Sequence, residues 1–179
     1  YPYVSQGRIF TPYWDKPVAV APSSFGATTW APPSYDPRTA TLYICGMDLV
    51  GLFVGGAHDA WQPEQQFLGG EFMFDGHRSG IFAAVDMRTN RVRWRQRWPD
   101  SCYSGSTATA GNLVFSGHND GRLVALDSRN GDALWSFQTG AGVNAQPAEF
   151  EHKGRQHVAV YAAVALFAQS KPGDSVWLF

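Results

Sequence analysis

Residues 80–94 repeat, without a gap and 41 positions further along the chain, as residues 121–135. Six positions correspond, either in residue type or in the backbone conformation that the residue allows: Gly80/Gly121, Ala84/Ala125, Asp86/Asp127, Arg88/Arg129, Asn90/Gly131 and Trp94/Trp135. A period in the low forties, with a strand on either side of a turn, is typical of β-propeller blades. The repeat therefore predicts an all-β chain built from propeller blades rather than two unrelated hairpins.

The shared residues each have a structural role in such a hairpin. Asp86 and Asp127 end short apolar strands, where a carboxylate can accept hydrogen bonds from the turn that follows. Asn90 and Gly131 are residue types that tolerate a positive φ, so the turn needs a left-handed residue there. The tryptophan at the last shared position is large enough to dock on a neighbouring blade, and we expect it to do so.

The length of the chain predicts the extent of the propeller. At four strands a blade, 179 residues suffice for roughly four blades. Residues 51–79 are punctuated by glycine and have no helical period, and they are predicted to be an inter-blade insertion. We expect residues 1–179 to be one partial β-propeller domain that needs a complement, with a four-blade unit that pairs with a second copy as an alternative.

Charge and hydropathy exclude several partners. The net charge of −1 argues against nucleic acid as a partner. The chain has no run of about 18 apolar residues, so no membrane span is predicted. Cys45 and Cys102 lack C-x-x-C spacing, so neither zinc nor haem attachment is indicated. Two buried free thiols are favoured over a disulfide.

Several motifs resemble the C-terminal blades of the quinoprotein alcohol dehydrogenases, eight-bladed propellers that hold pyrroloquinoline quinone (PQQ). They are Ala-Thr-Ala-Gly at 108–111, Asp-Gly at 120–121, Ala-x-Asp at 125–127, Gly-x-x-x-Trp at 131–135 and Gly-Ala-Gly-Val-x-Ala-x-Pro at 140–147. Residues 25–37 resemble the glycine-rich segment that precedes a Ser-Tyr-x-Pro turn in the same family. The resemblance covers roughly residues 20–179 and implies about half of an eight-bladed ring.

The resemblance implies an oxidoreductase that oxidises an alcohol or polyol to the carbonyl product and passes electrons to a cytochrome or another external acceptor. In the family, the quinone is polarised by Ca²⁺ or a lanthanide ion. Most of the metal ligands, the catalytic Asp and the arginine lie in blades N-terminal to anything present here. We therefore expect no catalytic residue and no metal ligand in this chain, a complementary N-terminal half that supplies them, and a periplasmic or secreted location.

Three residues fall at or beside positions that contact the cofactor in the family: Thr29, Trp30 and Tyr103. Thr29 replaces an amide side chain and Tyr103 replaces a tryptophan. A hydroxyl has one donor where an amide has two, and a phenol stacks less broadly than an indole. Phe167 corresponds to an aromatic position of the substrate pocket. These departures keep open a second interpretation, a non-catalytic propeller that acts as a scaffold for protein assembly.

Two further polar groups receive a structural interpretation. His58, Asp59 and His77 lie on a flexible glycine-containing stretch and are expected to be solvated rather than to bind a metal ion. His118, Asn119 and Asp120 precede Gly121 and are expected to cap a turn.

Overall fold

The computed structural model describes residues 13, 16–56, 61–65, 67, 70–165 and 168–179, without the side chains of 75–77. These residues form strands and turns. No helix long and apolar enough to span a bilayer occurs within these ranges.

The first of three antiparallel sheets is built around two long strands, β3 (Thr41–Gly55) and β4 (Gly70–Asp86). β5 (Arg91–Trp98) pairs with β4 on the far side. β1 (Val18–Val20) and β2 (Ser34–Asp36) both pair with β3, at opposite ends of that strand. This sheet is blade 1.

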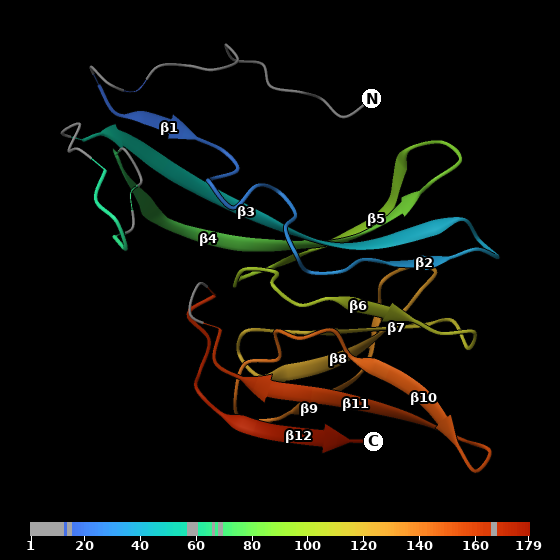
Figure 1. Ribbon diagram of the computed structural model, residues 1–179. Helices are drawn as coiled ribbons and strands as arrows, with labels where there is room; N and C mark the ends of the chain where they lie inside the picture. The colour runs from blue at the N-terminus through green and yellow to red at the C-terminus, as the bar shows by residue number, and fades with distance from the viewer. Residues whose placement is uncertain (1–12, 14–15, 57–60, 66, 68–69, 166–167) are drawn as a thin grey trace.

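The other two sheets follow blade 1 in chain order, as Figure 1 shows. Blade 2 has the strand order β6 (Ser106–Ala108), β7 (Leu113–Gly117), β8 (Arg122–Asp127) and β9 (Ala133–Gln138). Blade 3 has the order β10 (Ala148–His152), β11 (Arg155–Ala163) and β12 (Asp174–Leu178). Within blades 2 and 3 each strand pairs with the next one along the chain, as expected for blades.

The predicted all-β propeller class is confirmed, but the described residues form three blades where length alone suggested about four. The reason is the length of β3 and β4, which have 15 and 17 residues. The prediction that residues 51–79 are an insertion between blades is also corrected. Residues 51–55 continue β3 and residues 70–79 continue β4, so both ends of segment 51–79 lie inside one sheet.

The core lies between the blades because blade 2 buries both of its faces. Successive residues of a strand point to opposite faces, and β8 is apolar on both. One cluster joins blades 1 and 2 and contains Tyr43, Cys45, Phe82, Ala84, Trp98, Val114, Val124 and Leu126. A second joins blades 2 and 3 and contains Phe115, Leu123, Ala125, Val158, Val160 and Ala162.

The aspartate turn of the repeat has the predicted geometry. Asp86 accepts a hydrogen bond from the Arg88 amide and Asp127 accepts one from the Arg129 amide, both at 2.9 Å. Asn90 has a φ of 55° and Gly131 a φ of 83°. Hydrogen bonds from Arg129 hold the pKa of the Asp127 carboxyl at about 2, so this carboxylate is ionised at neutral pH.

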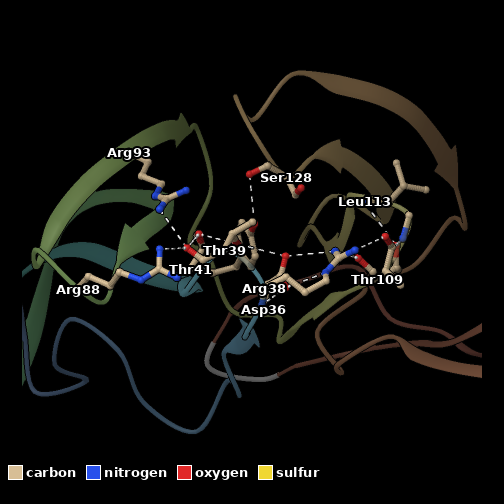
Figure 2. Close-up of polar contacts among 12 residues, drawn as sticks. Asp36, Arg38, Thr39, Thr41, Arg88, Arg93, Thr109, Leu113 and Ser128 are labelled. Carbon is tan, nitrogen blue, oxygen red and sulfur yellow. Dashed lines mark hydrogen bonds and ion pairs between the residues drawn. The ribbon is translucent and has the colours of Figure 1, made fainter.

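A third copy of the turn, which the alignment of two repeats missed, lies between β2 and β3. Asp36 accepts from the Arg38 amide at 2.9 Å, and Ala40 has the positive φ of 53°. Arg38 also donates to the carbonyl oxygens of Thr109 and Ala110, at 3.3 and 2.6 Å, and so joins blade 1 to blade 2 (Figure 2). The turn therefore fixes its own hairpin and the neighbouring blade.

Trp94 docks blade 1 on blade 2, as the repeat predicted. Its indole nitrogen donates to the Ser128 carbonyl oxygen at 3.0 Å, and the Tyr43 hydroxyl donates to the same oxygen at 3.2 Å. A Cβ at Gly131 would lie 2.7 Å from the Trp94 ring, so the indole occupies the space that only glycine leaves. Trp135 makes the corresponding contact to blade 3, edge-on to Phe179 at 5.2 Å.

The two cysteines form a disulfide, so the prediction of two free thiols is wrong. Cys45 lies on β3 and Cys102 follows β5, 57 positions apart in the chain, and their Cα atoms are 5.4 Å apart. The approach depends on the fold of blade 1, which sequence spacing does not reveal. β4 passes close to the Cys102 segment at Gly80, where a Cβ would lie 2.5 Å from the Cys102 nitrogen.

The inter-blade role of Trp94 is testable by truncation. Because it removes a docked ring and a hydrogen bond, Trp94→Ala should lower the free energy of unfolding by about 3 kcal/mol, measured by urea denaturation. Trp135→Ala is the matched control and should cost less, since Trp135 is 41% exposed. Equal losses of unfolding free energy for the two variants would contradict a larger contribution of Trp94 than of Trp135 to blade packing.

Candidate functional site

A pocket of about 450 Å³ lies where connections from all three blades meet. Trp30 comes from the connection between β1 and β2, and Tyr103 from the connection between β5 and β6. Gly142, Asn144 and Ala145 come from the connection between β9 and β10. The other lining residues belong to blade 3, with Tyr161 and Ala163 on β11 and Val164 and Ala165 just after it. The volume is in the range of small-molecule sites, and the walls are mainly apolar, as is usual for such sites.

The structure brings together two of the residues predicted from sequence. The rings of Trp30 and Tyr103 are 4.8 Å apart, centroid to centroid, and almost perpendicular at 89°. Trp30 is 60% exposed, whereas Tyr103 is 4% exposed. A flat ligand can therefore lie against the Trp30 indole, while Tyr103 supports that indole from the wall.

The Tyr103 hydroxyl is not presented to the pocket. The oxygen atom is buried and has no hydrogen-bond partner in the part of the chain that the structure describes. The residue packs with Met47, Leu49 and Ala168. Burial raises the pKa of the phenol above its ordinary value. The Tyr103 residue therefore contributes its ring, rather than its hydroxyl, to the pocket wall.

Thr29 does not join the pocket. It is exposed and is absent from the pocket lining, although it adjoins Trp30. Phe167 lies outside the described residues, as do His58, Asp59 and the side chain of His77. Across the described ranges, no group of three or more His, Cys, Asp or Glu residues is arranged to hold a metal ion.

Sequence reasoning missed the blade 3 side of the pocket. Asn144 donates to the Ser170 hydroxyl at 2.9 Å, and this hydroxyl also accepts from the Ala165 amide at 2.8 Å. A Cβ at Gly142 would lie 2.5 Å from that hydroxyl oxygen, so the bonded pair requires glycine there. The signal was present in the Gly-Ala-Gly-Val-x-Ala-x-Pro motif, where the glycine spacing anticipates a close backbone approach.

The predicted turn at His118–Asp120 has the expected bonds and also supports the Tyr103 segment. Gly121 donates to the His118 carbonyl at 3.1 Å, and the Asp120 carboxylate accepts from the Arg122 amide at 3.0 Å. Asn119 donates from its side chain to the Ser101 carbonyl at 3.0 Å. The turn thus fixes the chain two residues before Tyr103.

None of the described residues that line the pocket carries a formal charge. The lining is a mainly apolar platform, and it suits the binding of a planar group.

Comparison with known proteins identifies the class. The family described as "PQQ: Glucose/ethanol/alcohol dehydrogenase, beta-propeller domain" matches residues 84–158. The quinohemoprotein alcohol dehydrogenase ADH IIB of Pseudomonas putida is 31% identical over 169 residues, which are 92% of this chain and 24% of that protein. The lanthanide-dependent methanol dehydrogenase of Methylorubrum extorquens is 30% identical over 83% of this chain and 26% of its own length.

The structural comparison agrees. The quinohemoprotein alcohol dehydrogenase ADHIIG from Pseudomonas putida HK5 superposes with a TM-score of 0.81 at 27% identity, over 93% of this chain and 28% of that one. The described residues thus form blades of a β-propeller similar to those of the PQQ-dependent alcohol dehydrogenases. The chain is related to the PQQ-dependent alcohol dehydrogenases, and it spans about a quarter of the length of the curated relatives that it matches.

The buried phenol gives a direct test of the site geometry. Tyr103→Phe removes a hydroxyl without a partner, so the free energy of unfolding should stay unchanged or rise by up to about 1 kcal/mol. Tyr43→Phe is the matched control, because its buried hydroxyl donates to Ser128 at 3.2 Å, and it should cost about 1 kcal/mol. Urea denaturation measures both, and a similar loss for both variants would show that the Tyr103 hydroxyl has a partner.

Proposed function

We propose that this chain is part of a PQQ-dependent dehydrogenase that oxidises an alcohol or polyol and passes electrons to an external acceptor such as a cytochrome. The observation that carries the proposal is the apolar pocket built on Trp30 and Tyr103, in a chain related over most of its length to quinoprotein alcohol dehydrogenases. Its relatives have alcohol dehydrogenase, 1-butanol dehydrogenase and methanol dehydrogenase in their names.

The residues of the pocket fit a planar quinone. Trp30 offers an exposed indole face on which a flat ring can stack, and blade 3 encloses the far side with small apolar residues. Ala163, Val164 and Ala165 present small apolar side chains that leave room for a ring. When bound, the quinone supplies the redox chemistry by accepting two electrons from the substrate. The contribution of this chain is to bind the ring and keep its surroundings dry.

The remaining parts of the site belong, in this proposal, to a complementary N-terminal part. It would supply the Ca²⁺ or lanthanide ligands, the general base, and the cationic groups that an anionic quinone needs, because the pocket lining here is uncharged. A periplasmic or secreted location is part of the same proposal. The Cys45–Cys102 disulfide supports it, since disulfides persist in oxidising compartments.

The outer face of blade 3 supports the need for a complement. Strand register places Phe150, Tyr161, Val176 and Leu178 on one face, and these side chains are 44%, 49%, 71% and 62% exposed. The opposite face of the same blade is buried against blade 2. We propose that another blade of the same protein covers the exposed face, as blade 3 covers blade 2.

The enzymatic proposal is tested on the full-length protein that carries this chain, loaded with PQQ and either Ca²⁺ or a lanthanide ion. Dye-linked oxidation of primary alcohols and polyols should be detected, together with a quinone absorbance that survives gel filtration. Trp30→Ala should weaken PQQ binding about fivefold, because stacking on an aromatic ring contributes roughly 1 kcal/mol. Thr29→Ala, outside the pocket, is the matched control and should leave PQQ binding unchanged.

If the protein is instead a non-catalytic scaffold, neither PQQ binding nor alcohol oxidation is expected. A correctly folded full-length protein that neither retains PQQ nor oxidises any alcohol would reject the enzyme and favour a non-catalytic propeller. Normal PQQ binding by Trp30→Ala in an active enzyme would instead reject the assignment of this pocket.

Coverage of blade 3 is tested by two leucine truncations in the full-length protein. If another blade packs on this face, Leu178→Ala should lower the free energy of unfolding by about 2–3 kcal/mol, as for a core leucine. Leu134 lies on β9 and is 57% exposed, although both neighbouring blades of that strand are present. Leu134→Ala should therefore cost little in urea denaturation. A negligible effect of Leu178→Ala would show that the face stays in solvent.

A further inference from the structure

Both walls of the pocket are attached to the same short stretch of β3. The Met47 amide donates to the Ala27 carbonyl at 2.7 Å, and Ala27 lies three residues before Trp30. Two residues before Met47, Cys45 forms the disulfide with Cys102, the residue that precedes Tyr103. One strand therefore holds the Trp30 segment by a backbone hydrogen bond and the Tyr103 segment by a covalent bond.

The disulfide is enclosed in the core between blades 1 and 2. Cys45 is 3% exposed and Cys102 is 2% exposed. The Cys102 segment lies directly on β4 at Gly80, where a Cβ would be 2.5 Å from the Cys102 nitrogen and 2.7 Å from the Asp100 oxygen. Because the Cys102 segment is closely packed against β4, a displacement of Cys102 also displaces its neighbour Tyr103.

Hydrogen bonds attach the Tyr103 segment to more than one blade. Ser104 accepts from the Gly117 amide at 3.1 Å and donates to the Ala145 carbonyl at 3.0 Å, and the Asn119 side chain donates to the Ser101 carbonyl. Three residues after Tyr103, the Ser106 amide donates to the Pro32 carbonyl at 3.0 Å. The disulfide is the attachment to blade 1 that lies next to Tyr103 itself.

We infer that the Cys45–Cys102 disulfide positions Tyr103 against Trp30, so that retention of the pocket's ligand depends on this bond being oxidised. A dithiol that reduces the bond gives up two electrons and two protons, forms its own disulfide and leaves two thiols. Tyr103 then keeps its attachments to blades 2 and 3 but loses its covalent link to β3. The perpendicular contact that supports the Trp30 indole loosens. The part of this inference that concerns ligand retention rests on the proposed function.

The test compares the full-length wild type with the Cys45→Ala/Cys102→Ala double variant. PQQ affinity, measured by isothermal titration calorimetry, should fall about tenfold, because the pocket would have to be ordered on binding. Hydrogen exchange should accelerate in residues 24–32 and 99–105 beyond any change elsewhere. Leu123→Ala is the matched control: it opens a buried site between blades 2 and 3 and should destabilise the protein without changing these two segments or the PQQ affinity.

Reduction provides a second route if the double variant fails to fold. Wild-type protein treated with dithiothreitol and alkylated should lose PQQ affinity and local exchange protection as the variant does. Other disulfides of the full-length protein are controlled by treating the double variant in the same way, which should change nothing further at the pocket. Unchanged exchange in residues 99–105 and unchanged PQQ affinity after loss of the bond would overturn the inference.

The two proposals fail in distinguishable ways. If the wild type does not bind PQQ, the proposed function fails, and the exchange rates of residues 24–32 and 99–105 alone decide whether the disulfide positions the two segments. If the wild type binds PQQ and the disulfide-free protein binds it equally well, the positioning role fails and the proposed function stands.

Discussion

One peptide carbonyl, that of Ser128, receives two side-chain hydrogen bonds across the interface between blade 1 and blade 2. It accepts hydrogen bonds from Trp94 and Tyr43, both on blade 1, while the Trp94 ring fills the space above Gly131. The turn that carries this carbonyl is fixed by Asp127, whose pKa is held at about 2 by Arg129. Blade docking therefore depends on a turn that stays ionised and rigid across the physiological pH range.

The pocket follows from this docking rather than from any one blade. Trp30, Tyr103 and Asn144 come from three separate connections between strands, and β11 adds Tyr161 and Ala163. Small residues make the approach possible, since Gly80 and Gly142 each leave room for a neighbouring segment. The site is thus a property of the arrangement of blades, which explains why its lining is spread over much of the chain.

The repeat predicted the fold because its residues act locally. An aspartate that closes a turn, a residue with positive φ and an aromatic ring on the return strand have the same meaning wherever they occur, and Asp86, Asn90 and Trp94 behaved as expected. The disulfide and the length of β3 and β4 depend on distant pairing, and spacing gave no signal for either. Two residues predicted to contact the cofactor, Trp30 and Tyr103, lie in ring contact. The burial of the Tyr103 hydroxyl depends on packing against distant residues, which the local sequence does not reveal.

The described lining of the pocket is uncharged, and in the proposed complex this has a thermodynamic consequence. A planar anion that rests on the Trp30 indole would take its counter-charges from other blades, so its binding site would be complete only in the closed ring. Cofactor binding and closure of the propeller would then be thermodynamically coupled. Closure would raise the affinity for the cofactor, and the bound cofactor would raise the equilibrium constant for closure by the same factor. Such linkage would make the loaded holoprotein more resistant to dissociation and unfolding than the apoprotein, in proportion to the free concentration of the cofactor.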